Sequence, residues 1–372
     1  MPGKTVLILG SYAPSLVTFR GPLVAAMVAR GHRVIASAPS IASDTAADLQ
    51  DLGAEPRELP LSNVSLNPLA MFGSLRALKE LLLEIRPDVL LSYTIKPVIL
   101  GALAGRAARV PTIISLITGV GYAFTEGLEA RRRIARTAAS LLYRIALARS
   151  TAIVFQNPDD ESFFRNLGLL PRGATVHRTN GSGIDLDRFE PVPLPGETSF
   201  LMIARLLKDK GIREFAEAAK RIKADHPDVP IALVGRPDPS PDSLTSAELE
   251  DLLRHGIDFK GELADVRPAI AGCSVYVLPS YREGTPRSVL EAMAMGRAIV
   301  TTDAPGCRET VIQGKNGLLV PPRDAEALYE AMLRFVREPG LAAEMGPASR
   351  RLAEEKFDVR TVNSTLLEIA GL

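Results

Sequence analysis

The sequence predicts an α/β protein built from two Rossmann-like, doubly wound domains. Short β-branched runs alternate with helical patterns along the chain, and this rhythm is typical of a parallel sheet covered by helices. The rhythm starts again near residue 200, after a proline-rich stretch. A chain of 372 residues also exceeds what one hydrophobic core usually organises, so two domains are expected.

The expected strands form two sets of six. In the first half they lie at 6–9, 34–38, 89–93, 112–115, 152–156 and 174–177. In the second half they lie at 200–204, 231–234, 257–259, 275–278, 298–301 and 317–320. The prolines of 191–196 break both patterns and stiffen an extended connection. We therefore expect domains at 1–190 and 197–355, a linker at 191–196, and a helix at 356–372 that packs on either domain.

Composition narrows the class of protein. With 46% hydrophobic and 23% charged residues, the chain is typical of a folded globular protein. Cys273 and Cys307 lack the spacing of a disulfide framework or zinc site. The N-terminal apolar run at 5–9 is too short for a signal peptide, and the apolar stretch at 89–105 falls short of the ~20 residues that span a bilayer. We expect a cytoplasmic protein whose membrane contact is peripheral.

Charge is distributed unevenly between the two halves. Residues 1–150 hold 17 Lys and Arg against 10 Asp and Glu, whereas residues 151–372 hold 27 against 33. Most of the basic excess lies at 101–150, and 127–150 has an amphipathic pattern with interspersed arginines. Such a helix suits an anionic membrane or a phosphorylated acceptor, although a core-packed helix with a solvated outer face fits equally well. No nucleic acid is expected as a partner.

A strand–loop–helix unit in the second half resembles a phosphate-binding site. The helix follows the strand expected at 275–278, with Thr285 suited to the N-cap, Pro286 to the first helical position and Gly296 to the stop. The free backbone N–H groups and positive dipole end of such a helix bind phosphate without a basic side chain. The loop should therefore face a ligand beyond the carboxyl ends of the strands.

Two glutamates and two basic residues accompany this helix start. Glu283 precedes it and can accept hydrogen bonds from sugar hydroxyls, while Glu291 lies ~9 Å further along the axis, near a ribose diol. Either glutamate alone would be a surface charge, but their spacing in this unit favours a nucleotide site. Arg205 and Lys210 follow the strand at 200–204 and can neutralise a departing diphosphate; taken alone, they would belong to a solvated turn.

Several stretches together resemble glycosyltransferase family 4, the retaining GT-B enzymes, whose two domains face each other across a cleft. These stretches are 180–189, 204–211, 283–291 and 303–309. Within the family, the branch that builds capsules, O-antigens and lipid-linked oligosaccharides is resembled at Phe19-Arg20, Lys96-Pro97, 118–125 and 155–157. The resemblance covers nearly the whole chain.

The resemblance implies a UDP-sugar donor, with GalNAc or GlcNAc as the sugar, and a polyprenyl diphosphate-linked acceptor at the inner face of the cytoplasmic membrane. It implies no cofactor and no metal. The catalytic residues would be Glu283, Arg205 and Lys210. The donor would contact Gly235, Lys260, Gly261, Glu262, Leu263, Gly284, Thr285, Pro286 and Glu291. The acceptor would contact Phe19, Arg20, Lys96, Thr118, Gly119 and Tyr122.

Two features qualify this picture. Many family members carry a histidine in the acceptor-side loop where this chain has Thr118, so we expect a mechanism without a histidine there. The leaving diphosphate would take the acceptor proton on the same face, through an oxocarbenium-like state. Asp185 and Asp187 have the DxD form of metal-dependent transferases, but in this family the stretch is a connection.

Two other functions fit the same fold. A sugar-nucleotide 2-epimerase would need acid–base carboxylates and histidines at the cleft, and the loops expected there contain no histidine. A non-catalytic sugar- or nucleotide-binding clamp would not need a glutamate beside the phosphates.

Overall fold

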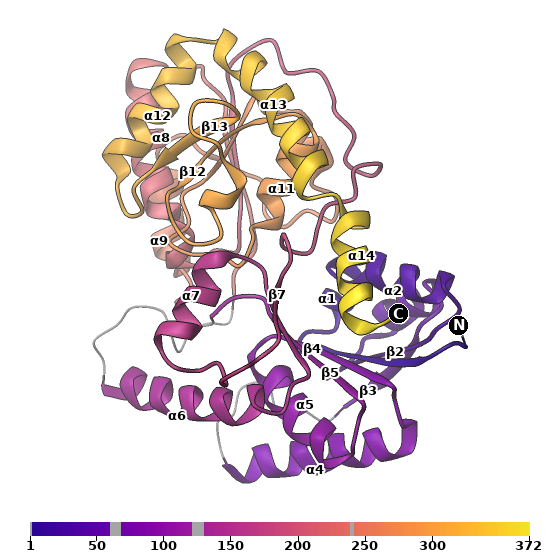
Figure 1. Cartoon of the computed structure of the whole chain (residues 1–372). Coiled ribbons are helices and arrows are strands. Elements are labelled where there is room, and N and C mark those ends of the chain that lie inside the picture. The colour runs from indigo at the N-terminus through magenta and orange to yellow at the C-terminus, as the bar shows by residue number, and fades with distance from the viewer. Residues whose placement is uncertain (1, 60–67, 121–129, 239–241) are drawn as a thin grey trace. The chain divides into compact units, whose positions relative to one another are not determined.

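The computed structural model describes residues 2–59, 68–120, 130–238 and 242–372; the side chains of 68–70 and 130–136 are not described. The chain divides into two compact units. The first comprises Met1–Ser182 together with Arg360–Leu372, and the second is Gly183–Val359. Each unit contains one sheet of parallel strands with helices, which confirms the predicted pair of doubly wound domains (Figure 1).

The first unit contains a seven-stranded sheet in the order β3-β2-β1-β4-β5-β6-β7. The strands are β1 (Thr5–Leu9), β2 (Arg33–Ala38), β3 (Glu55–Glu58), β4 (Val89–Tyr93), β5 (Thr112–Ile117), β6 (Ala152–Phe155) and β7 (Val176–Arg178). All pairings are parallel. Strand β3 was not predicted, because its sequence Glu-Pro-Arg-Glu lacks any apolar pattern. It is an edge strand, where charge and proline protect against further pairing.

Alternating side chains of β1 supply two separate cores, one on each face of this sheet. Leu7 and Leu9 belong to the apolar cluster that also contains buried residues of α4 (Pro68–Ile85), α5 (Ile95–Ala107) and α6 (Ala130–Leu147). Val6 and Ile8 belong to the cluster on the other face. The period of two along a strand explains this division.

The second face is covered from both ends of the chain. Its helices are α1 (Pro14–Thr18), α2 (Gly21–Ala29), α3 (Ser43–Asp51) and α14 (Val359–Ala370). Buried Val362 and Leu366 of α14 lie in the same cluster as β1. The C-terminal helix therefore packs on the first unit, a partner that the helical pattern alone left open.

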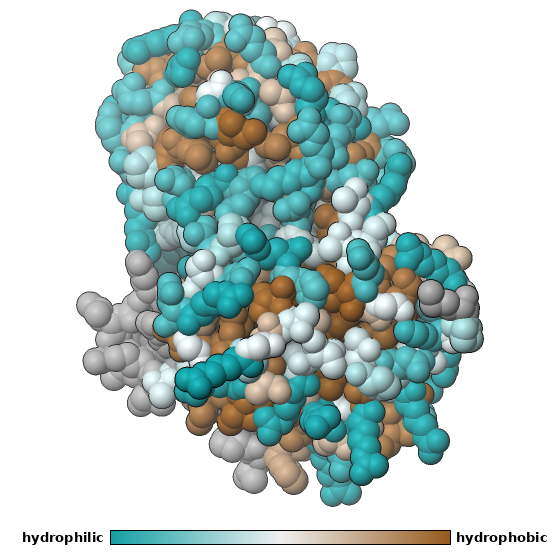
Figure 2. Space-filling model, viewed as in Figure 1, coloured by the Kyte–Doolittle hydropathy of each residue, from teal (hydrophilic) through white to brown (hydrophobic). Residues whose placement is uncertain are grey.

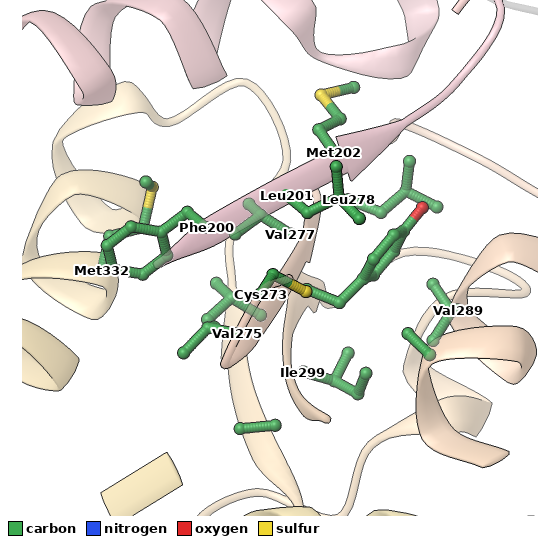
Figure 3. Packing of buried hydrophobic residues seen from close by; sticks show 14 of the residues in the cluster. Phe200, Leu201, Met202, Cys273, Val275, Val277, Leu278, Val289, Ile299 and Met332 are labelled. Carbon is green, nitrogen blue, oxygen red and sulfur yellow. The ribbon is translucent and has the colours of Figure 1, made fainter. Parts of the chain in front are cut away.

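The second unit contains a six-stranded parallel sheet in the order β10-β9-β8-β11-β12-β13. The strands are β8 (Phe200–Ile203), β9 (Ile231–Val234), β10 (Asp258–Phe259), β11 (Val275–Leu278), β12 (Ala298–Thr302) and β13 (Gly317–Val320). The helices include α8 (Ile212–Asp225), α9 (Ser246–Leu253), α10 (Arg267–Ala271), α11 (Arg287–Ala294), α12 (Ala325–Arg337) and α13 (Gly340–Lys356). Figure 3 shows side chains of β8, β11 and β12 packed against Val289 of α11 and Met332 of α12.

The structure divides the units eight residues before the boundary expected at 190. Ile184, Leu186 and Phe189 are buried in the core of the second unit, and Arg350 donates hydrogen bonds to the carbonyls of Leu186 and Phe189. The proline-rich segment at 191–196 also lies within that unit. Burial of these apolar side chains, rather than the position of the prolines, determines where the two units divide.

The side chains that contact solvent are mostly polar on the face drawn in Figure 2, with apolar residues visible between them. None of the helices in the described part of the chain has the length and apolar character needed to cross a membrane.

Candidate functional site

Parallel strands bring several loops of the second unit to one edge of its sheet. Strands β8, β9, β11 and β12 are hydrogen-bonded neighbours that run in the same direction, so the loops that follow them leave from the same side. This is the side on which open α/β sheets bind ligands. Of the predicted donor residues, Gly235 and Gly284 to Pro286 lie on these loops, Lys260 to Leu263 follow the neighbouring parallel strand β10, and Glu291 lies in α11.

Lys210 and Glu283 form an ion pair at this edge. Lys210 Nζ lies 2.6 Å from Glu283 Oε1, and the two side chains are 11% and 18% exposed. Lys210 ends the short helix η2 (Lys208–Lys210) after β8. Burial lowers the pKa of Lys210, but the charges of Glu283 and Asp209 outweigh burial and raise it above its ordinary value. The lysine is therefore a cation held in place beside the loop that carries Glu283.

A left-handed glycine allows these two loops to approach. Gly211 has φ 72°, and a Cβ there would lie 2.1 Å from the carbonyl oxygen of Pro279. The backbone N–H of Tyr281 then donates to the carbonyl of Asp209 at 2.9 Å. Only glycine accommodates both the conformation and the contact.

The loop after β12 holds the backbone of Glu283 from the other side. The N–H of Glu283 donates to the carbonyl of Pro305 at 2.9 Å. Gly306, with φ 80°, lies so close that a Cβ would be 2.2 Å from the carbonyl oxygen of Glu283. Segment 303–309, singled out by the sequence, thus positions Glu283.

The start of α11 differs from the prediction by one residue. Pro286 is the N-cap, with no side-chain hydrogen bond to the helix, and the hydroxyl of Thr285 donates to the carbonyl of Gly284 at 2.9 Å. The predicted Thr285 cap is therefore wrong, because this hydroxyl is engaged away from the helix. The predicted stop is confirmed: Gly296 follows the helix with φ 76°.

Glu291 is buried and paired with a residue to which the sequence gave no role. Arg287 Nε donates to Glu291 Oε1 at 2.9 Å. Burial raises the pKa of Glu291, while the charge and hydrogen bond of Arg287 act to lower it. The spacing of four residues along a helix was the sequence signal that could have identified Arg287 as its partner.

Arg205 does not contact Glu283 in this structure. Its guanidinium lies 2.8 Å from Asp238 Oδ2, and the arginine side chain is 54% exposed. The predicted Lys260-to-Leu263 loop is attached to the strand end by a hydrogen bond from the Gly235 N–H to the Gly261 carbonyl, at 2.9 Å. A Cβ at Gly235 would lie 2.1 Å from the carbonyl oxygen of Ala204.

The side chains of this loop form ion pairs with neighbouring strands and loops. Lys260 Nζ lies 2.6 Å from Asp258, and Glu262 lies 3.5 Å from Arg236. Leu263 packs partly buried against the core. Asp238 and Arg236, which sequence reasoning missed, come from the loop after β9.

In the first unit, hydroxyl groups connect the carboxyl ends of β1 and β4. Tyr93 is buried, and its hydroxyl lies 2.8 Å from Ser15 Oγ of α1. Thr94 donates to Ser11 at 2.9 Å. Thr94 has φ 67° and ψ 159°, a region that is essentially restricted to glycine, and such strain collects at functional sites.

One predicted acceptor residue, Arg20, contacts this network, and the other described ones follow β1, β4 and β5 in the chain. Arg20 is buried with its guanidinium 5.0 Å from the centre of the Tyr93 ring, whereas Phe19 is 40% exposed. Burial lowers the pKa of Lys96 in the first turn of α5. Thr118 and Gly119 follow β5 and are half-buried. Tyr122 lies outside the described residues.

Comparison with known proteins decides the family. The family described as "Glycosyl transferases group 1" matches residues 197–338, and the "Glycosyl transferase 4-like domain" matches residues 17–181. The N,N'-diacetylbacillosaminyl-diphospho-undecaprenol alpha-1,3-N-acetylgalactosaminyltransferase of Campylobacter jejuni is 31% identical over 342 residues, 88% of each chain. The chain belongs to glycosyltransferase family 4.

A second relative agrees with that assignment, and solved structures of other proteins share the fold. The UDP-Gal:alpha-D-GlcNAc-diphosphoundecaprenol alpha-1,3-galactosyltransferase of Escherichia coli is 27% identical over 291 residues, 73% of this chain and 72% of the relative. Sucrose-phosphate synthase from Thermosynechococcus elongatus superposes with a TM-score of 0.80 at 19% identity, covering 98% of both chains. Anabaena HepE, solved with UDP, superposes at 0.78 and 19%, covering 99% of this chain and 100% of its own. The GT-B fold is confirmed.

The described residues of this glycosyltransferase contain no group of three or more His, Cys, Asp or Glu side chains that could hold a metal ion. In the DxD stretch, Asp185 Oδ1 accepts hydrogen bonds from the backbone N–H groups of Asp187 and Arg188. Leu186 between them is buried in the core. Here the stretch forms a turn.

Proposed function

We propose that this glycosyltransferase moves an N-acetylhexosamine, GalNAc or GlcNAc, from its UDP conjugate to a polyprenyl diphosphate-linked saccharide, with retention of configuration. The observation that carries the proposal is the buried Lys210–Glu283 pair at 2.6 Å, beside the start of α11. The name of the Campylobacter relative supports the donor sugar and the lipid-linked acceptor, and the UDP complex of HepE supports a uridine nucleotide.

The second unit would hold the donor. Its diphosphate would lie between Lys210 and the N-terminus of α11, where a cation and backbone N–H groups both attract anions. Glu283, held by Lys210, would accept hydrogen bonds from hydroxyls of the transferred sugar. Glu291 would receive the ribose hydroxyls. Arg205 would exchange its exposed ion pair with Asp238 for the diphosphate.

Transfer would proceed on one face of the sugar without an enzymic nucleophile or a metal ion. The bond from the anomeric carbon to the diphosphate oxygen breaks, and its electron pair leaves with the diphosphate. The acceptor hydroxyl oxygen bonds to the same carbon, and its proton passes to the departing diphosphate oxygen. Lys210 and Arg205 stabilise the negative charge that develops there. Stabilisation of developing charge by fixed groups is usually the largest single contribution to catalysis.

The acceptor would bind at the carboxyl edge of the first unit. Phe19, Arg20, Lys96, Thr118 and Gly119 are the described residues proposed for it. Cations such as Arg20 and Lys96 suit the diphosphate of a lipid-linked saccharide, and an exposed aromatic ring such as Phe19 suits the face of a sugar. Thr118 stands where many family members have histidine, so no histidine would contribute at that position.

The first unit would also contact the inner face of the cytoplasmic membrane through α6. Leu141 and Ile145, one turn apart, are 58% and 36% exposed. The helix sequence contains five arginines and no acidic residue. Exposed apolar side chains on a helix of basic sequence suit an anionic lipid surface.

Incubation of the protein with a panel of UDP-sugars and a polyprenyl diphosphate-linked saccharide tests the proposal, with products identified by mass. Transfer of one sugar is expected, and it should disappear in Glu283→Ala and Lys210→Ala. Lys208→Ala, on the same short helix, is the matched control. Epimerised free nucleotide-sugar, or binding without turnover, would replace the proposal with one of the two other functions, and full transfer by both variants would refute the assigned roles.

A further inference from the structure

Arg287 and Glu291 form a pair whose position is unusual for a helix. Arg287 is the first residue of α11, and its Nε donates to Glu291 Oε1 at 2.9 Å. The two side chains are 23% and 12% exposed. No second hydrogen bond to the Glu291 carboxylate comes from the described residues.

Helix stability does not account for this arrangement. A cation in the first turn opposes the positive end of the helix dipole, and an arginine that precedes its glutamate by four residues is the less favourable order. Desolvating both charges adds a further cost. By contrast, Arg334 and Glu338 have the same order and spacing, but Arg334 lies in the last turn of α12, where a cation is favoured, and both side chains are exposed.

The surroundings of Glu291 explain why it needs a fixed cation. Burial raises its pKa, and Asp265 on the loop after β10 adds to that effect. Arg287, and more weakly Arg188 from the segment before the second unit's first strand, lower it. Tyr276 of β11 also lies within electrostatic range. Arg287 is thus the main group that opposes the effect of burial on the pKa of Glu291, and it fixes one of the two carboxylate oxygens.

We propose that Arg287 is a positioning residue that acts through Glu291: by holding Oε1, it presents the charged carboxylate to the two hydroxyls of the donor ribose. This role rests on the proposed use of a uridine nucleotide. A charged acceptor with one oxygen anchored binds a pair of hydroxyl donors more strongly than a neutral or rotating one. Arg287 would then set the preference for ribose over sugars that lack the diol.

The test compares binding of UDP with binding of 2′,3′-dideoxy-UDP by isothermal titration calorimetry, using the full chain. The wild type should prefer UDP by about tenfold, as expected for hydrogen bonds to a charged group. Arg287→Gln should lower UDP affinity by about tenfold and reduce the preference to about twofold. Arg287→Lys should fall between them, and Arg334→Gln should match the wild type.

Two further readouts separate positioning from a direct contact. Adding Glu291→Gln to Arg287→Gln should lower UDP affinity little further, because the two changes remove the same interaction. UDP affinity of Arg287→Gln should also fall between pH 8 and pH 6 more than that of the wild type, since Glu291 without its arginine takes up a proton more readily.

If Arg287→Gln lowers the affinities for UDP and 2′,3′-dideoxy-UDP equally, the inference is overturned, because Arg287 would then contact the diphosphate. Fully additive losses in the double variant would do the same. If the wild type binds no UDP, the proposed function itself fails. If the wild type binds UDP and prefers the diol but Arg287→Gln retains that preference, only the role of Arg287 fails.

Discussion

The two units have the same kind of parallel sheet, but the carboxyl edges of these sheets are built from different chemistry. In the second unit, ion pairs occupy the edge, including Lys210 with Glu283 at 2.6 Å and Arg287 with Glu291 at 2.9 Å. In the first unit, the connections are between hydroxyl groups, such as Tyr93 with Ser15 at 2.8 Å.

This difference matches the two halves of the proposed reaction. A sugar nucleotide loses a doubly charged diphosphate, so its site needs cations and carboxylates that are already oriented before binding. An acceptor enters as a neutral hydroxyl, so its site needs uncharged partners near the reacting atom and cations only near its distant diphosphate. The same fold can therefore serve both substrates through its loops alone.

The largest expected effect comes from exchanging the charges of the donor-side pair. Either single change, Lys210→Glu or Glu283→Lys, breaks a buried pair and should cost about 3–5 kcal/mol of unfolding free energy. The double exchange should recover much of that loss, because the two charges still attract. Transfer should nevertheless stay about a thousandfold below wild type, since the cation has moved away from the diphosphate.

Urea unfolding and initial transfer rates measure the two effects separately. A double variant that regains both stability and transfer would show that the pair serves only the fold.

The next effect concerns glycines of matched conformation, one in each unit. Gly211 and Gly173 have φ 72° and 73°. A Cβ at Gly211 would lie 2.1 Å from a backbone oxygen, whereas at Gly173 nothing lies within 4 Å. Gly173→Ala should cost about 1 kcal/mol from the left-handed conformation alone, and Gly211→Ala should cost about 3 kcal/mol or more. Equal losses on urea unfolding would contradict the role given to Gly211.

Much of the fold could be predicted because its strands are buried runs bounded by turns. All six strands expected in the second unit are present, and the first unit differs by the addition of β3. That strand escaped prediction because residues 55–58 have no apolar pattern, and the ion pair of Glu55 with Arg33 joins residues 22 positions apart in the sequence. The division at Ser182 was also displaced from the predicted boundary, because burial of Ile184 and Phe189 depends on tertiary packing that no local pattern reveals.

The membership of the candidate site stays a prediction, and the pairing of its side chains could not be predicted from the sequence. Lys210 and Glu283 are 73 residues apart, and only the parallel order of β8 and β11 brings their loops together. Arg205 was expected on the same ligand, yet it pairs with Asp238, which no motif identified. The Thr285 cap failed because hydroxyl orientation depends on the loop and not on the residue type.

A smaller effect is expected on lipid binding, which should depend on the first unit and not on the second. Leu141→Glu with Ile145→Glu places two negative charges on the exposed face of α6, and binding to vesicles containing anionic phospholipid should fall about tenfold. Ile312, 46% exposed in the second unit, supplies the matched control Ile312→Glu, which should bind like the wild type. Unchanged binding of the α6 variant in co-sedimentation would remove α6 from the membrane contact.

The smallest effect tests whether strain in the first unit serves the acceptor. Thr94 occupies a backbone region costing about 1–3 kcal/mol for a residue with a side chain, and its hydroxyl regains part of this through Ser11. Thr94→Ala should destabilise the protein by about 1 kcal/mol, because it removes the hydrogen bond and keeps the strain. Thr94→Gly should be more stable than Thr94→Ala by about 1 kcal/mol or more, since glycine relieves the strain.

If the strained threonine is retained for the acceptor, both variants should raise the acceptor KM severalfold and leave the donor KM unchanged. In the second unit, by contrast, the positive φ after η2 falls at Gly211, where the backbone of Pro279 leaves no room for a side chain. The first unit has Thr94 at its position of positive φ, so the hydroxyl is present although the backbone conformation is strained. An unchanged acceptor KM in Thr94→Gly would mean that this hydroxyl serves only the loop after β1.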